Sequence, residues 1–170
     1  LAGISAAAQI LGARFPADDP AREVAAEVRA RIAGLNAFVG DILSYARPRP
    51  LSRCPHSLRG IVHAATGALA RDPAWAGVVV ACEGEDRAIL ADGEQLAQAL
   101  LNLLLNAAQA MEGRGTITVT LGEADGAATL TVADRGPGIA PGNRAKLFEA
   151  FFTTKVRGSG LGLVVVKRIA

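Results

Sequence analysis

The chain has 170 residues, of which 51% are hydrophobic and 20% are charged, so its composition predicts a folded protein rather than a disordered one. This length holds one ordinary domain and a smaller appendage. The net charge of +2 is too small to favour nucleic acid as a partner.

The cysteines and the lengths of the apolar runs limit the class of protein to which the chain can belong. Cys54 and Cys82 stand far apart, in neither a metal-ligand spacing nor a disulfide framework, which indicates two reduced cysteines in a cytoplasmic protein. No apolar run reaches the roughly 18 residues of a membrane helix, because Asn102 and Asn106 interrupt the longest one. No signal peptide is recognisable. We therefore expect no membrane contact from this chain.

Two helices are predicted in residues 1–46. The first repeats apolar residues at steps of three and four: Leu1, Ile4, Ala8 and Leu11. Asp19 and Pro20 suit the N-cap and first position of the second helix. Its apolar residues follow a heptad: Val28, Ile32, Leu35, Val39, Ile42 and Ala46. A hairpin with one narrow seam usually buries it in a four-helix bundle, so we predict a homodimer through this hairpin.

The two predicted helices differ in length. The second, about 27 residues, would span roughly 40 Å, whereas the first offers only about 14 residues. We therefore infer that the first helix is cut short at Leu1; a naturally unequal hairpin is the alternative.

A basic, proline-bearing segment separates the hairpin from the remainder. Arg47-Pro48-Arg49-Pro50 ends the second helix, since proline cannot continue it, and residues 47–56 are predicted as a semi-stiff linker. In residues 57–170 we expect helices at Ser57–Ala70, Asp92–Met111, Asn143–Phe151 and Leu161–Ala170. We expect strands at Val78–Cys82, Ala88–Ala91, Thr116–Leu121 and Ala127–Ala133. Antiparallel strands mixed with helices predict an α+β chain, in which an α/β sandwich follows the hairpin.

The helix that begins after Asp92 is leucine-rich nearly all round and should be buried. Asp92 can cap it, with Gln95 in the capping-box position. One polar stripe breaks its apolar surface: Gln98, Asn102, Asn106 and Gln109. Buried amides need partners. Hydrogen bonds to neighbouring backbone, or a Mg²⁺ ion with phosphate oxygens, would each supply them.

Two glycine-rich turns follow. Asp134, at a strand end before Gly136 and Gly138, is placed either to accept from an exocyclic amine such as that of adenine or to form an ordinary turn. The second turn opens the last helix, where free backbone N–H groups favour an anion: Gly158, Ser159, Gly160, Leu161, Gly162 and Leu163. Just before it, Thr153, Thr154 and Lys155 could reach a terminal phosphate, or the lysine could simply be solvated.

The order of these motifs resembles that of the catalytic, ATP-binding domain of bacterial sensor histidine kinases, within the superfamily of gyrase, Hsp90 and MutL. Asn106 matches the asparagine box that binds Mg²⁺. Asp134 begins the first glycine box, which ends at Ile139 and whose aspartate holds the adenine amine. Leu147–Phe152 matches the phenylalanine box, and Gly158–Leu163 the second glycine box. The Phe-Thr-Thr-Lys segment is most similar to the nitrogen-regulation type.

This resemblance implies ATP and Mg²⁺ as cofactors and a response-regulator receiver domain as partner. The γ-phosphoryl group would pass to a histidine and then to a receiver aspartate. Leu1-Ala2-Gly3-Ile4 is similar to the residues just after the family's histidine box, so the acceptor would lie six positions before Leu1. His56 and His63 are not expected to accept phosphate. A parent protein anchored in a membrane is compatible with this fragment.

The chain departs from the family pattern at two places. Gln109 stands where the family often has a basic residue that touches phosphate, so we expect a weaker contact there, or its replacement by Lys155. The chain ends at Ala170, where such domains normally continue, so we expect an incomplete sheet.

In hydrolysing relatives a glutamate one turn before the metal asparagine activates water. Here that residue is Asn102, whose amide takes up no proton near neutral pH. This favours phosphoryl transfer. A hydrolysing ATPase and a nucleotide-free dimerisation and docking module are the alternatives.

Overall fold

The computed structural model describes residues 2–16, 19–46, 50–155 and 158–170. The chain divides into two units. The hairpin unit comprises Leu1–Pro48 and Thr153–Ser159, and the sandwich unit comprises Arg49–Phe152 and Gly160–Ala170. The segment 153–159 thus groups with the hairpin although it interrupts the sandwich unit in the sequence.

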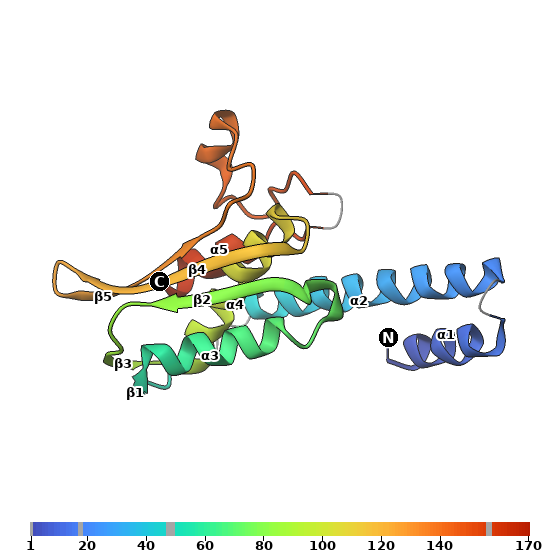
Figure 1. Cartoon of the computed structure of the whole chain (residues 1–170), viewed down its shortest axis with the longest axis horizontal. Helices are drawn as coiled ribbons and strands as arrows, with labels where there is room; N and C mark the ends of the chain where they lie inside the picture. Colours follow the sequence, from blue (N-terminus) through green and yellow to red (C-terminus); the bar gives the residue numbers. More distant parts are fainter. Residues whose placement is uncertain (1, 17–18, 47–49, 156–157) are drawn as a thin grey trace. The chain divides into compact units, whose positions relative to one another are not determined.

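Two helices of the hairpin unit, α1 (Ala2–Arg14) and α2 (Pro20–Ala46), run side by side (Figure 1). Asp19 caps α2, because its Oδ1 accepts a hydrogen bond from the Ala21 N–H at 2.8 Å. Gly12 lets the helices approach closely, since a Cβ there would lie 3.2 Å from the Ala25 Cβ. The two predicted helices are therefore confirmed.

The apolar seam of α2 is largely uncovered within this chain. Ile32 is buried, whereas four other residues of the seam are exposed: Val28, Leu35, Val39 and Ile42. Ile4, Ile10 and Leu11 of α1 are exposed as well. The side chains of Leu1, Ala8 and Ala46 lie outside the described part of the chain.

The sandwich unit contains two sheets. In the smaller, β1 (Cys54–Ser57) pairs antiparallel with β3 (Ala88–Ala91). The larger has the strand order β2-β4-β5, formed by Gly77–Glu83, Arg114–Ala124 and Ala127–Ala133. β2 runs parallel to β4, with Gly77 opposite Arg114 and Glu83 opposite Thr120.

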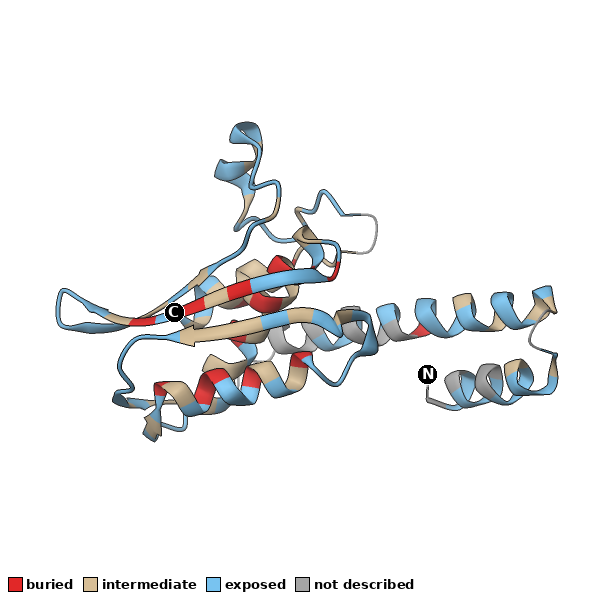
Figure 2. Ribbon diagram, viewed as in Figure 1, coloured by how far each residue is buried: buried red, intermediate tan, exposed pale blue. Residues whose placement is uncertain are grey.

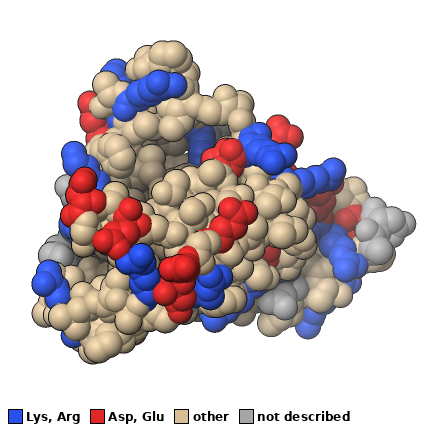
Figure 3. Space-filling view, turned by 60° about the vertical axis from the view of Figure 1, so that its left-hand side comes forward, with Lys and Arg blue, Asp and Glu red and all other residues tan. Residues whose placement is uncertain are grey.

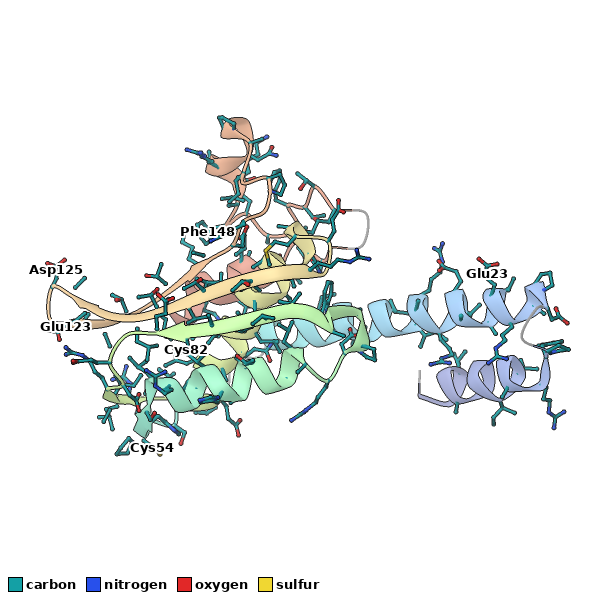
Figure 4. All side chains as sticks on the ribbon, in the orientation of Figure 1. Glu23, Cys54, Cys82, Glu123, Asp125 and Phe148 are labelled. Atoms are coloured by element: carbon teal, nitrogen blue, oxygen red, sulfur yellow. The ribbon has the colours of Figure 1, made fainter. Side chains whose placement is uncertain are left out.

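A two-residue turn joins β4 to β5, which pair antiparallel from Ala124 and Ala127 to Thr118 and Ala133. Asp125 and Gly126 have φ values of 52° and 75°. Positive φ at both central residues is the requirement of a type I′ hairpin turn, and Asp-Gly is a favoured pair for it. Figure 4 shows Asp125 at the tip of this hairpin.

Three helices complete the sandwich unit: α3 (Leu58–Leu69), α4 (Gly93–Ala110) and α5 (Gly162–Ile169). Two short 3₁₀ helices, η1 (Pro73–Trp75) and η2 (Pro141–Lys146), lie in the connections. The core joins α3 and α4 to the face of β4 formed by Ile117, Val119 and Leu121. Figure 2 shows buried residues along α3 and β4. The helices therefore cover one face of the larger sheet.

The start of α3 is held by a carboxylate from the loop after β2. Ser57 caps the helix by accepting from the Gly60 N–H at 3.0 Å, and its hydroxyl donates to Asp86 Oδ2 at 2.7 Å. The Arg59 N–H donates to Asp86 Oδ1 at 2.9 Å. These bonds, first that of the Arg59 N–H and then that of the Ser57 hydroxyl, lower the pKa of Asp86.

Three features of the sandwich unit differ from the sequence predictions. The prediction of a helix at Asn143–Phe151 is wrong: the 3₁₀ helix η2 ends at Lys146 and turns follow it, and the φ of 67° at Phe151 stops any helix from continuing into the next segment. Strand β1 lies in the segment predicted as a linker, where Pro55 and the shortness of the strand hide any alternation. β2 and β4 are parallel, whereas only antiparallel pairs were predicted.

Surface and cysteine features are unremarkable in the described residues. Cys54 and Cys82, on different strands, are free thiols (Figure 4). Basic and acidic side chains are interspersed on the face shown in Figure 3. Of the helices described, none has both the length and the apolar character needed to cross a membrane.

Candidate functional site

Helix α4 carries the predicted metal asparagine, and its start is firmly fixed. The Asp92 carboxylate accepts from the Gln95 N–H at 3.1 Å, as an N-cap does, and from the Ser52 N–H at 3.1 Å. Gln95 Nε2 donates to the same carboxylate at 3.1 Å, whereas in a capping box the Gln95 side-chain oxygen would accept from the Asp92 N–H. The backbone N–H groups of Ser52 and Gln95 lower the pKa of Asp92. This carboxylate therefore ties the segment predicted as a linker to α4.

The imidazole of His56 covers the first residue of α4. A Cβ at Gly93 would lie 2.8 to 2.9 Å from three atoms of the His56 ring. His63 is exposed on α3. Neither histidine therefore belongs to the hairpin helices.

Asn102 joins α4 to the second glycine motif. Its Nδ2 donates to the Gly162 carbonyl oxygen at 3.2 Å, and its Oδ1 accepts from Gln98 Nε2 at 3.4 Å. A Cβ at Gly162 would lie 3.8 Å from the Asn102 Cγ, an ordinary van der Waals contact, so this approach does not itself require glycine. Both ends of the Asn102 amide thus have protein partners, one of them backbone.

The first glycine motif meets α4 two turns later, at Ala110. A Cβ at Gly136 would lie 2.8 Å from the Ala110 Cβ, so only glycine permits this approach. Asp134 stabilises the turn, since its Oδ1 accepts from the Gly136 N–H at 2.8 Å. Ala110 was not singled out in the sequence; a small residue one turn after Asn106 is the signal that would have identified it.

The two glycine motifs therefore lie against one stripe of α4. Asn102, Asn106 and Ala110 follow at intervals of four residues, so they share one side of the helix. Eight residues at 1.5 Å each separate Asn102 from Ala110 by about 12 Å. Asn106 stands midway between the residue that contacts Gly162 and the one that contacts Gly136. The structure thus brings Asn102, Asn106, Asp134, Gly136 and Gly162 to one side of α4.

The remaining residues of the first motif are open. Gly138 has a φ of 73° and no atom within 4 Å of where its Cβ would stand. Ile139 is 49% exposed. This loop thus presents glycine backbone and one apolar side chain to the surroundings.

The second glycine motif begins α5 from a buried anchor. Leu161 is fully buried and precedes the first helical residue, Gly162. Gly160 accepts a hydrogen bond at its carbonyl from the Phe151 N–H at 3.1 Å. Leu163 lies in the first turn of α5. The N–H groups of such a first turn have no partner within the helix, which suits an anion.

Five predicted residues belong to the hairpin unit: Thr153, Thr154, Lys155, Gly158 and Ser159. Within that segment the Thr153 Oγ1 accepts from the Lys155 N–H at 3.1 Å. Their role toward the residues on α4 stays a prediction.

The donor set constrains how a metal could bind. In the described residues no group of three or more His, Cys, Asp or Glu side chains could hold a metal ion. Asn106 offers a hard amide oxygen, and Gln109 is exposed one turn further along α4. Mg²⁺ is often held by one or two protein oxygens together with substrate phosphates and water. This arrangement fits a metal that arrives with a nucleotide better than a metal held by protein alone.

A separate hollow of about 680 Å³ lies on the other side of the larger sheet. Its walls include Thr116 and Thr118, which alternate with the core residues of β4, and also Arg114 and Arg135. Gly136 is the one predicted site residue that lines it. Ala110 lines it as well, so the hollow adjoins the stripe on α4 at its Ala110 end, while neither Asn102 nor Asn106 is among its lining residues.

Comparisons with known proteins give the family. Residues 91–170 match the family model described as histidine kinase-, DNA gyrase B-, and HSP90-like ATPase. Over 99% of its length the chain is 32% identical to the sensor histidine kinase ZraS of Escherichia coli K12, and it spans 37% of that protein. Over 44% of its length it is 49% identical to the C4-dicarboxylate transport sensor protein DctB of Rhizobium meliloti, spanning 12% of that protein.

Solved structures agree with these relatives. The mycobacterial sensor histidine kinase MprB is 30% identical, with a TM-score of 0.61, over 69% of this chain and 78% of that one. Full-length ShkA in complex with AMPPNP is 30% identical, with a TM-score of 0.73, over 98% of this chain and 37% of that one.

Residues 91–170 thus form an ATPase domain of the class shared by histidine kinases, gyrase B and HSP90. The chain belongs to the sensor histidine kinases of two-component systems. The predicted α+β fold with a kinase-type sandwich is confirmed.

Proposed function

We propose that this chain is the core of a sensor histidine kinase, which binds Mg-ATP and passes the γ-phosphoryl group to a histidine and then to an aspartate of a response-regulator receiver domain. The stripe on α4 carries this proposal. At Asn102 the stripe contacts the backbone at the start of α5, and at Ala110 it contacts the Asp134–Gly136 turn. Asn102 and Ala110 are about 12 Å apart along α4. An adenine at the turn and phosphates at the start of α5 would place the metal near Asn106.

Each group has a stated part in binding. Asp134 would accept from the adenine amine through the oxygen that does not bind the Gly136 N–H. The open backbone at Gly138 and the side chain of Ile139 would lie against the base. The first-turn N–H groups of α5, with Thr153, Thr154, Lys155, Gly158 and Ser159, would contact the phosphates.

Catalysis would consist of positioning and neutralisation of charge. A Mg²⁺ ion bound with the nucleotide would offset the negative charge of the phosphates. Asn106 would hold it, and Gln109 would offer a weak phosphate contact. Asn102 has no basic group to activate water, which favours transfer over hydrolysis.

The acceptor and the partners extend the proposal beyond the ATPase domain. His56 contacts Gly93 and His63 is exposed on α3, so we propose that the acceptor histidine comes from outside these 170 residues. The exposed seam of α2 supports a homodimer through the hairpin. ATP is a cytoplasmic substrate, and we place this chain in the cytoplasm.

Calorimetry with a non-hydrolysable ATP analogue and Mg²⁺ tests the proposal. Asp134→Asn is nearly isosteric and keeps an oxygen for the Gly136 N–H, but it turns a donor toward the adenine amine. We expect an affinity loss of about ten- to a hundredfold, as for a hydrogen bond to a charged group. Glu85→Gln, an exposed neutralisation outside the motifs, is the control. No binding by the parent would favour a docking module. If incubation with Mg-ATP releases phosphate steadily and no phosphorylated protein forms, a hydrolysing ATPase would be favoured.

A further inference from the structure

A side-chain hydrogen bond from Asn102 joins α4 to the start of α5. The two residues it joins are 60 positions apart in the sequence. Gly162 is the first residue of α5, so its position sets that of the first-turn N–H groups. We infer that Asn102 is a positioning residue. Its bond fixes the start of α5 at one position along the axis of α4 and thereby orients the first-turn N–H groups of α5 that would bind phosphate. This inference rests on the proposed function.

Two hydrogen bonds fix the orientation of the Asn102 amide and support this role. The Nδ2 group directs one of its two N–H donors at the Gly162 carbonyl at 3.2 Å. The Oδ1 atom accepts from Gln98 at 3.4 Å, which orients the amide so that Nδ2 faces α5. Asn102 is also only partly exposed, and Leu161 beside it is fully buried. The bond therefore acts at a packed junction, where a shift of α5 is transmitted to the loop before it.

The position of the start of α5 along α4 is important because the first glycine motif is also fixed on α4. Gly136 touches Ala110, two turns beyond Asn102, and glycine alone fits there. With both ends fixed on one helix, the distance between the base-binding turn and the phosphate-binding N–H groups is set by α4 itself. Loss of the Asn102 bond would free one end of this span and leave the other unchanged.

Two measurements on Asn102→Leu test this role. Leucine has the same branching at Cγ and the same number of side-chain heavy atoms, but no hydrogen-bond donor. First, in the nucleotide-free protein, hydrogen exchange at the hydrogen-bonded amides of α5, from Val165 to Arg168, should rise by about five- to tenfold, as expected for one hydrogen bond. Secondly, affinity for the ATP analogue should fall by about five- to tenfold while affinity for adenosine stays unchanged. A merely destabilised fold would not change the ratio of these two affinities.

Asn143→Leu, the same substitution in η2 and outside α4 and both glycine motifs, is the control and should leave both measurements near those of the parent. If Asn102→Leu does not fold, Asn102→Ser, which is too short to reach Gly162, takes its place with the same expected results. Unchanged exchange in the nucleotide-free variant would overturn the inference, and so would an equal loss of adenosine and ATP-analogue affinity. The exchange result is independent of nucleotide. Absence of binding by the parent would overturn the proposed function, and with it the positioning role.

Discussion

The backbone of Phe151 lies directly against Gly160. The Phe151 N–H donates to the Gly160 carbonyl oxygen at 3.1 Å, and a Cβ built on Gly160 would stand 2.4 Å from the carbonyl carbon of Phe151. Both residues have a φ of 67°. The junction before α5 thus depends on a glycine at 160 and holds an aromatic residue in a left-handed conformation that costs roughly 1–3 kcal/mol.

Gly160→Ala should therefore destabilise the sandwich unit by more than about 1 kcal/mol, since the new Cβ meets backbone that cannot rotate away and the φ value is unfavourable for alanine. Thermal unfolding followed by circular dichroism measures this. Gly142→Ala is the control, because Gly142 has open space and no positive φ. Equal melting temperatures for the two variants would contradict the packing described here.

Because the His56 ring lies against Gly93, the effect of Gly93→Ala on stability should change sign when the ring is removed. Gly93→Ala alone should destabilise the protein by about 1 kcal/mol, because the methyl group would meet the ring. In a His56→Ala background the same change should stabilise it by about 0.5–1 kcal/mol, the usual gain of alanine over glycine in a helix. Urea unfolding of the four proteins measures the coupling. A coupling energy near zero would show that the ring moves aside without cost.

Local patterns predicted those elements whose determinants are close together in the sequence. The cap at Asp92 and the turn at Asp125-Gly126 depend on residues within four positions, and both are present. Strand β1 depends on its partner β3, more than thirty residues away. The residues Cys54–Ser57 alone contain no pattern that predicts this pairing. The parallel pairing of β2 and β4 likewise depends on long-range packing.

The candidate site was predictable as a set of residues but not as a set of contacts. Resemblance to the family identified Asn106, Asp134 and the glycines. The sequence left two partners open for the amide stripe, backbone or metal with phosphate. Only the fold shows that Asn102 contacts the Gly162 carbonyl, because that carbonyl is 60 residues away. Ala110 was not predicted because the alanine side chain has no functional group. Its small size is important only because Gly136 packs against it.

Acid should weaken the hold of Asp86 on the start of α3. Its folded-state pKa is lowered by the Arg59 N–H and the Ser57 hydroxyl, so its contribution is fully present above the unfolded value of about 3.9. The contribution is lost as the pH falls through the lower folded value. The difference in unfolding free energy between the parent and Asp86→Asn should therefore be constant near neutral pH and shrink below about pH 4.

Urea unfolding across that pH range measures the difference. Glu85→Gln, an exposed neutralisation one residue earlier, serves as control and should lack this trend. A difference between the parent and Asp86→Asn that stays constant to the lowest pH would show that the Asp86 charge does not stabilise the helix start.

The exposed seam of α2 predicts how dimerisation can be broken. Leu35 is 48% exposed and lies on the seam with Val39 and Ile42, so a second copy of the hairpin would bury it. Leu35→Asp would place a charge in that interface and should weaken the dimer at least about a hundredfold, or about 2.7 kcal/mol. Ala30→Asp puts the same residue on the exposed opposite side of α2 and should leave the dimer intact. Sedimentation equilibrium of the three proteins decides between these outcomes. A parent that stays monomeric at high concentration, or two variants that dissociate equally, would show that this seam is not the dimer interface.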